Sequence, residues 1–161
     1  MARVGLNVVL VEPEIPHNTG AIARLCLATG STLHLVGRLG FRIDEKSVRR
    51  AGLDYWQHVP IVQHPTFADF VNSFAGEIFL YESRQGVDYS QSRVEGPTAL
   101  VFGSETRGLP ESILELGLPR YRVPIYDERV RSLNLATTVG IVLYDAVAQL
   151  KRVGLWGDAG Q

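Results

Sequence analysis

Three segments combine glycine or proline with polar and charged side chains, and these are the places where the chain could bind a ligand or do chemistry. They read PEIPHNTG (Pro13–Gly20), GSETRGLP (Gly103–Pro110) and YDERVRSLN (Tyr126–Asn134). A glycine lets a ligand approach the backbone closely, and consecutive amides in a turn can bind polar groups. The segments are therefore candidate ligand loops, with plain strand–turn–helix connections as the alternative.

Individual residues in and near these loops leave the same choice open. Glu105 and Arg107 bring charges of both signs to the second loop. Ser132 or Asn134 could serve only as the cap of a following helix, which is the commoner role of such residues. Arg24 lies roughly 200° around a helix from Ile22, so it points away from the apolar stripe, as a solvated arginine also would.

A basic group lies between the first two loops. Lys46, Arg49 and Arg50 follow i, i+3, i+4 spacing and would share one helix face, with Tyr55 a few residues further on. Basic side chains beside aromatic rings can hold phosphates and stack on bases. A solvated helix face with its aromatic residues in the core is the alternative.

Several familiar activities lack their signatures. The sequence has no G-x-G-x-x-G, no G-x-x-x-x-G-K-[ST] and no G-x-S-x-G pattern. The histidines lack metal-ligand spacing, so no metal is expected. The single cysteine, Cys26, excludes an internal disulfide and favours a reducing cytoplasm.

The loops must be positioned by alternating strands and helices. Apolar runs predict six strands, and helical spacing predicts helices at about Thr19–Thr29, Asp44–Gly52, after Thr66, after Pro110 and from about Asn134. The predicted strands are Leu6–Val11, Thr32–Val36, Val59–Val62, Ile78–Tyr81, Ala99–Phe102 and Tyr121–Ile125. This order predicts an α/β fold with a mostly parallel six-stranded sheet and helices on both faces. Ligands bind such sheets at the carboxyl ends of the strands, where all three loops should lie.

Bulk properties limit the class of protein. The chain has 161 residues, the length of one domain, and its net charge of −1 argues against a general nucleic-acid binder. Any RNA binding must come from a local basic patch. The apolar run near the N-terminus is too short for a signal peptide or a membrane span, so no membrane is expected.

Taken together, the motifs resemble those of the SPOUT RNA methyltransferases, and within them the TrmL (YibK-like) group of tRNA (cytidine/uridine-2′-O-)-methyltransferases. Three motifs occur in order, PEIPHNTGAIARLC (Pro13–Cys26), FGSETRGLP (Phe102–Pro110) and RSLNLATTVGIVLYD (Arg131–Asp145). The segment RRAGLDYW (Arg49–Trp56) also resembles this group. The departures are His17, where a second proline is expected, and Ala21, where asparagine is expected.

The resemblance implies a single SPOUT domain over residues 1–161, with a C-terminal trefoil knot and a tail after about residue 151 that could be flexible or cover a dimer edge. It implies a cytoplasmic homodimer that binds S-adenosylmethionine and methylates the 2′-oxygen of the wobble nucleotide of tRNA. The alternatives are another RNA target, such as ribosomal RNA, or a module of this fold that binds without catalysis.

The resemblance also assigns roles by position. The cofactor cleft would include Tyr81, Gly103, Ile125, Ser132 and Leu133, and the polar catalytic residues would be Asn18, Arg24, Glu105, Ser132 and Asn134. Arg24 would orient the attacking hydroxyl, because an arginine stays protonated and is a poor base. The expected tRNA contacts are Lys46, Arg49, Arg50, Tyr55 and Arg107.

Overall fold

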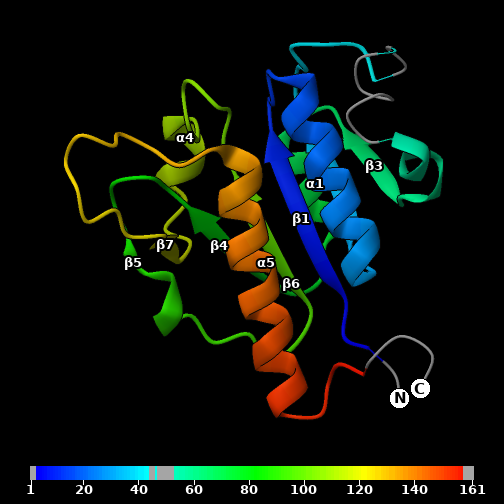
Figure 1. Cartoon of the computed structure of the whole chain (residues 1–161), viewed down its shortest axis with the longest axis vertical. Coiled ribbons are helices and arrows are strands. Elements are labelled where there is room, and N and C mark those ends of the chain that lie inside the picture. The colour runs from blue at the N-terminus through cyan, green and yellow to red at the C-terminus, as the bar shows by residue number, and fades with distance from the viewer. Residues whose placement is uncertain (1–2, 44–45, 47–52, 158–161) are drawn as a thin grey trace.

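A seven-stranded parallel sheet forms the centre of the computed structural model, which describes residues 3–43, 46 and 53–157 (Figure 1). The strand order is β3-β2-β1-β6-β4-β7-β5, and every neighbouring pair is parallel. The strands are β1 (Leu6–Val11), β2 (Thr32–Val36), β3 (Ile61–His64), β4 (Glu77–Tyr81), β5 (Val87–Asp88), β6 (Thr98–Phe102) and β7 (Arg120–Arg122). The α/β class and the parallel sheet are confirmed.

The sheet has seven strands, so the predicted number of six is wrong. The strand that the sequence did not reveal is β5, which has only two residues. Val87 pairs with Tyr121, and so short a strand carries no alternation that a sequence pattern could reveal. The strand predicted at Val59–Val62 lies at Ile61–His64 instead. Pro60 has no N–H to donate, and only its carbonyl joins the sheet, by accepting from the Leu33 amide at 2.9 Å.

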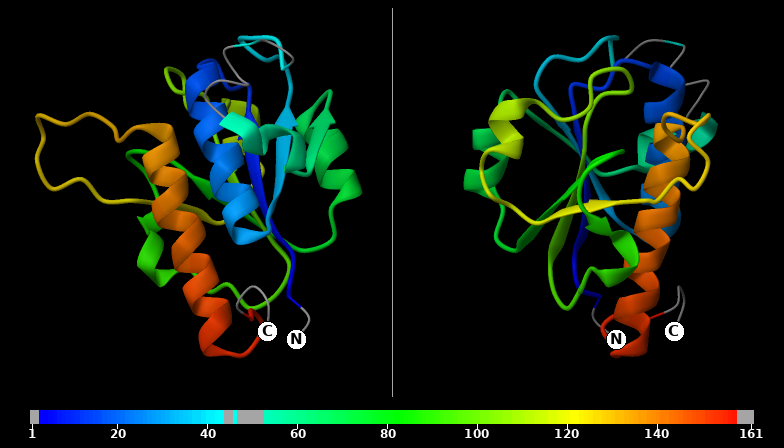
Figure 2. Two further views of the ribbon diagram at one scale, coloured as in Figure 1. Left: turned by 45° about the vertical axis from the view of Figure 1, so that its right-hand side comes forward. Right: turned by 90° about the vertical axis from the view of Figure 1, so that its left-hand side faces the viewer.

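Helices cover both faces of the sheet, as predicted. The helical segments are α1 (Pro16–Thr29), η1 (Leu53–His58), α3 (Phe67–Ser73), η2 (Tyr89–Gln91), α4 (Glu111–Leu114) and α5 (Leu135–Arg152). One hydrophobic cluster joins α1 and α5 to the sheet, and a second cluster joins α3 and α4 to the opposite face. Figure 2 (right) shows this sandwich with α5 on one side and α4 on the other. Within the described part of the chain, no helix is long and apolar enough to cross a membrane.

Local chemistry explains where the helices begin and end. Helix α1 begins at Pro16, three residues before the predicted start, because proline fits the first turn of a helix. It ends at Gly30, whose φ of 72° allows its amide to bond the carbonyls of Cys26 and Leu27. The capping box predicted at Thr66 and Asp69 is confirmed at the start of α3.

The apolar stripe predicted on α5 is buried, and α5 ends at Arg152. Beyond it, the Trp156 side chain is only 7% exposed, and the Arg3 guanidinium lies 5.3 Å from the centre of its ring. The Val4 amide donates to the Leu155 carbonyl at 3.2 Å. The residues that follow α5 therefore pack against the segment that leads into β1.

A row of hydrogen-bonded side chains, Asn7, His34 and His64, links the neighbouring strands β1, β2 and β3. The Asn7 Oδ1 atom can only accept, so His34 Nε2, 2.9 Å away, must carry the proton. Neutral His34 then accepts at Nδ1 from His64 Nε2, also at 2.9 Å. Burial, and secondarily the neighbouring His64, lowers the pKa of His34 to about 4, so His34 is neutral at pH 7.

This arrangement predicts a loss of stability in mild acid. The unfolded chain takes up a proton on His34 near a pKa of about 6.5, whereas the folded chain does so only near pH 4. Stability contributed by neutral His34 is thus complete above pH 6.5 and is lost as the pH falls towards 4. Urea unfolding at pH 7.5 and pH 5 should show a smaller acid loss in His34→Gln than in the wild type. The exposed-site variant His58→Gln should behave as the wild type, and an equal loss in all three proteins would contradict the prediction.

Candidate active site

The three candidate loops lie together at the carboxyl ends of the central strands, as the parallel sheet requires. The first follows β1, the second follows β6, and the third, residues 123–134, connects β7 to α5. The parallel pairing of β1 and β6 places their carboxyl ends at the same edge of the sheet, and Figure 1 shows residues 123–134 arching outward between β7 and the start of α5. The predicted clustering of the loops is therefore present.

A carboxylate from each of the first two loops accepts hydrogen bonds from the other loop. Glu105 accepts hydrogen bonds from the backbone amides of Glu14, at 2.8 Å, and Ile15, at 3.2 Å. Ile15 is the N-cap of α1 and has no capping side chain of its own. Glu105 therefore caps α1 from 90 residues away, and its negative charge lies at the positive end of the helix dipole.

Glu14, in the first loop, accepts hydrogen bonds from the second loop. Its Oε1 atom accepts from the Thr106 hydroxyl at 2.6 Å and from the Thr106 amide at 3.4 Å. The hydroxyl bond is the main cause that lowers the pKa of Glu14, which keeps this carboxylate ionised. We call the residues Glu14, Glu105 and Thr106 the clasp.

Arg107, a predicted tRNA contact, lies beside this acidic group. Its guanidinium is 3.5 Å from the Glu12 carboxylate and 3.9 Å from that of Glu14, although the side chain is 67% exposed. Glu12 has a φ of 50°, which only a minority of non-glycine residues adopt. Arg107 thus balances the carboxylates of Glu12 and Glu14 and still has much of its surface free for a ligand.

Gly103 has a role within the loop itself, and the predicted approach of a ligand to its backbone stays a prediction. A Cβ atom placed there would lie 2.1 Å from the Gly108 carbonyl carbon and 2.2 Å from the Leu109 nitrogen. The chain turns back on itself here, with Ser104 and Gly108 joined by backbone hydrogen bonds of 3.0 and 3.3 Å. Glycine is therefore required by the fold of the loop itself, whatever the loop binds.

Asn134 joins the third loop to the first. Its Oδ1 atom accepts from the Thr137 amide at 3.2 Å, so it is the N-cap of α5, as expected for its position. Its Nδ2 atom donates to Oδ1 of Asn18 at 3.1 Å. Asn18 is buried within α1, so these two expected catalytic residues link the starts of the two helices.

Three of the predicted cofactor residues lie in the third loop, Tyr81 ends β4, and Gly103 follows β6. Tyr81 is buried and stacks on Phe102 with ring centres 5.0 Å apart, and burial raises the pKa of its hydroxyl. Ile125 and Leu133 are half-buried, and Ser132 is exposed. Among the amides of residues 125–133, only those of Arg129 and Val130 have hydrogen-bond partners within the described part of the chain. The loop therefore offers free backbone donors beside apolar side chains, which suits a ligand with a polar heterocycle.

Arg24 lies away from this group. Its guanidinium carbon is 5.2 Å from the centre of the Tyr55 ring, in a cation–π contact with η1. Leu25 faces α5, since a Cβ added to Gly140 would lie 3.6 Å from it. Arg24 is about 100° around the helix from Leu25. Within one chain, the structure therefore does not bring Arg24 together with Ser132 or Asn134.

The predicted basic helix face stays a prediction. Lys46 is exposed, but Arg49 and Arg50 lie outside the described residues, as does most of the helix expected over 44–52. Tyr55 is 40% exposed, and its ring already contacts Arg24.

The sequence interpretation missed two residues of the clasp, Glu14 and Thr106. One signal could have found them. Pro16 marks the start of a helix, yet Ile15 before it cannot cap with its side chain, so a partner had to come from another part of the chain. Nothing in the sequence says which loop supplies that partner.

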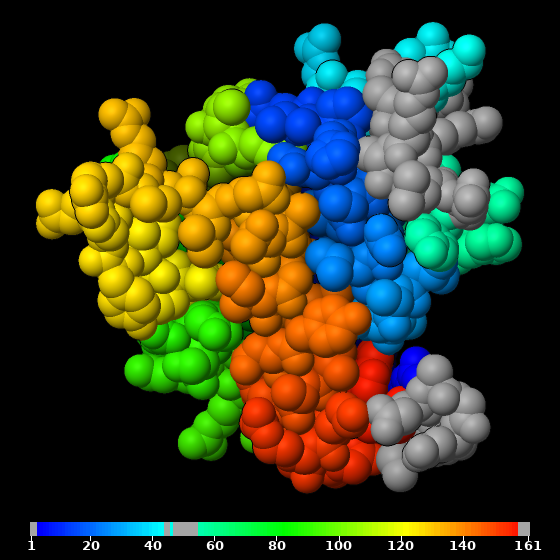
Figure 3. All heavy atoms as spheres, viewed as in Figure 1, coloured from blue at the N-terminus to red at the C-terminus, as the bar shows by residue number. Residues whose placement is uncertain are grey.

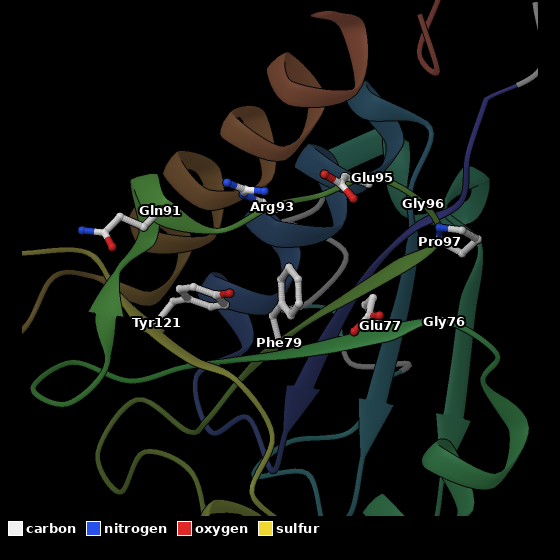
Figure 4. Close-up of a pocket in the computed structure, with 9 residues that line it drawn as sticks. All are labelled: Gly76, Glu77, Phe79, Gln91, Arg93, Glu95, Gly96, Pro97 and Tyr121. Atoms are coloured by element: carbon white, nitrogen blue, oxygen red, sulfur yellow. The ribbon is translucent and has the colours of Figure 1, made fainter. Parts of the chain in front are cut away.

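A separate open pocket of about 570 Å³ lies near the start of β4 (Figure 4). Phe79 and Tyr121 meet edge to face at its wall, with ring centres 5.1 Å apart. Its lining residues are Gly76, Glu77, Phe79, Gln91, Arg93, Glu95, Gly96, Pro97 and Tyr121. None of the predicted site residues is among them. We place the active site at the carboxyl ends of the strands, because the three polar loops meet there.

Comparison with known proteins identifies the family of the chain. Residues 5–144 match the model of the SpoU rRNA Methylase family, and this range includes all three loops. The chain belongs to the SpoU rRNA methylase family. Its SpoU relatives include the tRNA (cytidine(34)-2'-O)-methyltransferase of Escherichia coli (strain K12), which is 41% identical over 149 residues and matches 90% of this chain and 94% of the relative.

Solved SpoU structures share the fold. One that concerns the 2-OH methylation of C/U34 on tRNA superposes with a TM-score of 0.88 at 40% identity and covers 92% of this chain and 98% of its own. The AdoMet-bound rRNA methyltransferase from Sinorhizobium meliloti superposes with a TM-score of 0.82 at 28% identity and covers 91% of this chain and 57% of its own.

Loss of the clasp should destabilise this SpoU protein. Glu105→Ala leaves the Glu14 and Ile15 amides without their acceptor, and loss of a helix cap typically costs about 1 kcal/mol. Urea unfolding should show that loss, whereas the exposed Glu115→Ala should change stability little. Equal stability of Glu105→Ala and the wild type would show that the cap contributes nothing.

Proposed function

We propose that the protein transfers the methyl group of S-adenosylmethionine to the ribose 2′-oxygen of the wobble nucleotide, a cytidine or uridine at position 34, in the anticodon loop of tRNA. The observation that carries this proposal is the match along nearly the full length of both chains to the E. coli tRNA (cytidine(34)-2'-O)-methyltransferase. The three polar loops of that match meet at the edge of the sheet where ligands bind.

The third loop would hold S-adenosylmethionine. Free amides between Ile125 and Leu133 fit the polar edge of an adenine, and Tyr81, Ile125 and Leu133 supply apolar contacts. Gly103 would form the opposite wall through its backbone. The AdoMet-bound S. meliloti relative supports the same cofactor for this chain. When bound, the sulfonium supplies an electrophilic methyl group.

The protein's own contribution would be alignment of the ribose oxygen with that methyl group, which can be worth about 7–11 kcal/mol. The clasp and the Asn18–Asn134 bond fix the starts of α1 and α5, so Glu105, Asn18 and Asn134 would act mainly by holding the loops in place. The attacking hydroxyl must lose a proton, and the exposed Ser132 or a water molecule would receive it.

Arg24 would orient the hydroxyl and the adjacent phosphate. Because it faces η1 and not the third loop of its own chain, we propose that the active form is a homodimer in which Arg24 reaches the loop of the partner. The Tyr55 ring would hold its guanidinium in place. Lys46, Arg49, Arg50, Tyr55 and Arg107 would contact tRNA, and a dimer doubles this patch, which answers the objection of a net charge of −1.

The same proposal includes a single cytoplasmic domain over residues 1–161 with a C-terminal trefoil knot. Contacts between α5 and the connection from β4 to β6 support the knot. Gln149 of α5 accepts from the Val94 amide at 2.9 Å and donates to the Ser92 hydroxyl at 3.3 Å. The connection therefore lies directly against the helix that would pass through it.

Ribosomal RNA is the second candidate substrate, because the S. meliloti relative is an rRNA methyltransferase. That relative is longer, since the match covers 57% of its chain, whereas the E. coli tRNA enzyme is covered over 94%. The higher identity to the tRNA enzyme, 41% against 28%, and the fuller coverage of that relative favour tRNA.

Methyl transfer from labelled S-adenosylmethionine tests the substrate directly. Purified protein should label tRNA but not ribosomal RNA, and mass spectrometry should identify the product as a 2′-O-methylated nucleotide 34. A tRNA in which that ribose is 2′-deoxy should accept no label. Label in ribosomal RNA alone would favour the second candidate, and binding of the cofactor without transfer to either RNA would indicate a binding module.

Replacement of Arg24 tests its proposed role at the hydroxyl. Arg24→Ala should lower kcat by roughly 10²–10³-fold, the typical effect of losing one preorganised donor at a reacting group. The affinity for S-adenosylmethionine should change little, because Arg24 is proposed to act on the ribose hydroxyl and its phosphate and not on the cofactor. Mixing Arg24→Ala with an inactive variant of Ser132 should restore activity if the site is shared between subunits. No restoration in the mixed dimers would contradict the sharing.

A further inference from the structure

Tyr126 is the most exposed large hydrophobic residue among those that the structure describes, at 92%, followed by Val153 at 61%. It lies in the third loop, which projects from the body of the molecule (Figure 2, left) and forms a separate lobe in the space-filling view (Figure 3). Single exposed apolar residues are common on protein surfaces. The position of this ring and the structure of the turn beside it distinguish it from such residues.

The turn after Tyr126 is held by its own contacts. Asp127 accepts from Arg129 through the backbone amide at 3.0 Å, Nε at 2.9 Å and Nη2 at 2.6 Å. The Val130 amide donates to the Asp127 carbonyl at 3.1 Å. The backbone amide and the guanidinium of Arg129 both bind the Asp127 carboxylate, and we call this pair of residues the Asp127–Arg129 bracket. The bracket orders the turn, with Tyr126 just before it in the sequence and Arg131 just after it. No hydrogen bond or ion pair within the described residues engages the side chain of either.

Tyr126 and Arg131 adjoin proposed cofactor residues in the sequence. Tyr126 follows Ile125, and Arg131 precedes Ser132 and Leu133, which are proposed cofactor residues. A nucleotide bound at the third loop would meet the Tyr126 ring and the Arg131 guanidinium together. Bases stack on exposed aromatic rings, and arginine binds the neighbouring phosphates.

The charges of residues 126–131 favour stacking over phosphate binding as the main contribution of this turn. The segment YDERVR holds two acidic and two basic residues, so its net charge is zero. Four charged residues in six also fit poorly with the core of a protein–protein interface, where charged side chains are depleted. The neutral, solvated ring is therefore better suited to an RNA base than to a second protein surface.

We infer that Tyr126 is a stacking platform for a base of the anticodon loop, next to the methylated nucleotide, and that Arg131 holds the adjoining phosphate. This inference rests on the proposed function and adds a substrate-recognition residue to it. Tyr126 contributes through its aromatic face, and Arg131 contributes through its charge. The two contributions therefore respond differently to salt.

Binding of an anticodon stem-loop RNA to the full-length protein tests the inference. Tyr126→Ala should weaken binding by roughly ten- to a hundredfold, as expected for loss of one base stack. That factor should be the same at low and high salt. Arg131→Ala should weaken binding mainly at low salt, and it should lower the slope of log affinity against log salt by about one. Affinity for S-adenosylmethionine should not change in either variant.

Matched variants separate stacking from other roles. Tyr126→Trp should retain the affinity of the wild type, and Tyr126→Leu, of comparable size but without an aromatic face, should not. Leu116→Ala, at an exposed apolar site after α4, serves as the control. Unchanged RNA affinity in Tyr126→Ala, equal rescue by Leu and Trp, or a change in cofactor affinity or in oligomeric state would overturn the inference.

The failure of this inference can be told from failure of the proposed function. If wild-type protein methylates tRNA and Tyr126→Ala binds the stem-loop equally well, only the stacking role is wrong. If the wild type does not methylate tRNA, the proposed function is wrong. The same variant series on an unstructured single-stranded RNA then decides whether Tyr126 stacks on bases.

Discussion

The exchange of carboxylates between the first and second loops is the constraint on which the rest of the site depends. Glu105 caps α1, and Glu14 holds Thr106, so neither loop has its observed shape without the other. Most of these bonds are exposed to solvent, so each one contributes modestly, and it is their number that fixes the two loops against each other. Because α1 also carries Asn18, this exchange sets the position at which α5 begins.

The third loop differs from the other two in how it is held. Its ends are fixed, by β7 on one side and by the Asn134 cap of α5 on the other. Between them, few backbone groups have partners, and the Asp127–Arg129 bracket orders only the tip. A loop with anchored ends and free donors can close around a ligand with little loss of structure elsewhere. In the proposed site, the first two loops form a wall and the third supplies the binding groups.

Much of the fold could be predicted from the sequence, because buried strands such as Leu6–Val11 are apolar apart from a single residue and Thr66 begins a local capping box. Strand β5 could not be predicted, since two residues carry no alternation of apolar and polar side chains. In the candidate site, the cap at Asn134 was predictable from its neighbours. The partners of Glu105 and the direction of Arg24 were not, because they depend on loops 90 residues apart and on the packing of η1.

The strand order has a consequence for how the chain is made. Strand β1 pairs with β2, which follows closely, but its other neighbour is β6, where Leu6 lies beside Thr98. During synthesis, the first three strands can assemble while one edge of β1 stays open until β6 leaves the ribosome. Such an edge is a template for pairing with other chains. Nascent chains of this protein are therefore most prone to aggregate midway through translation, and slow, non-local pairing prolongs that interval.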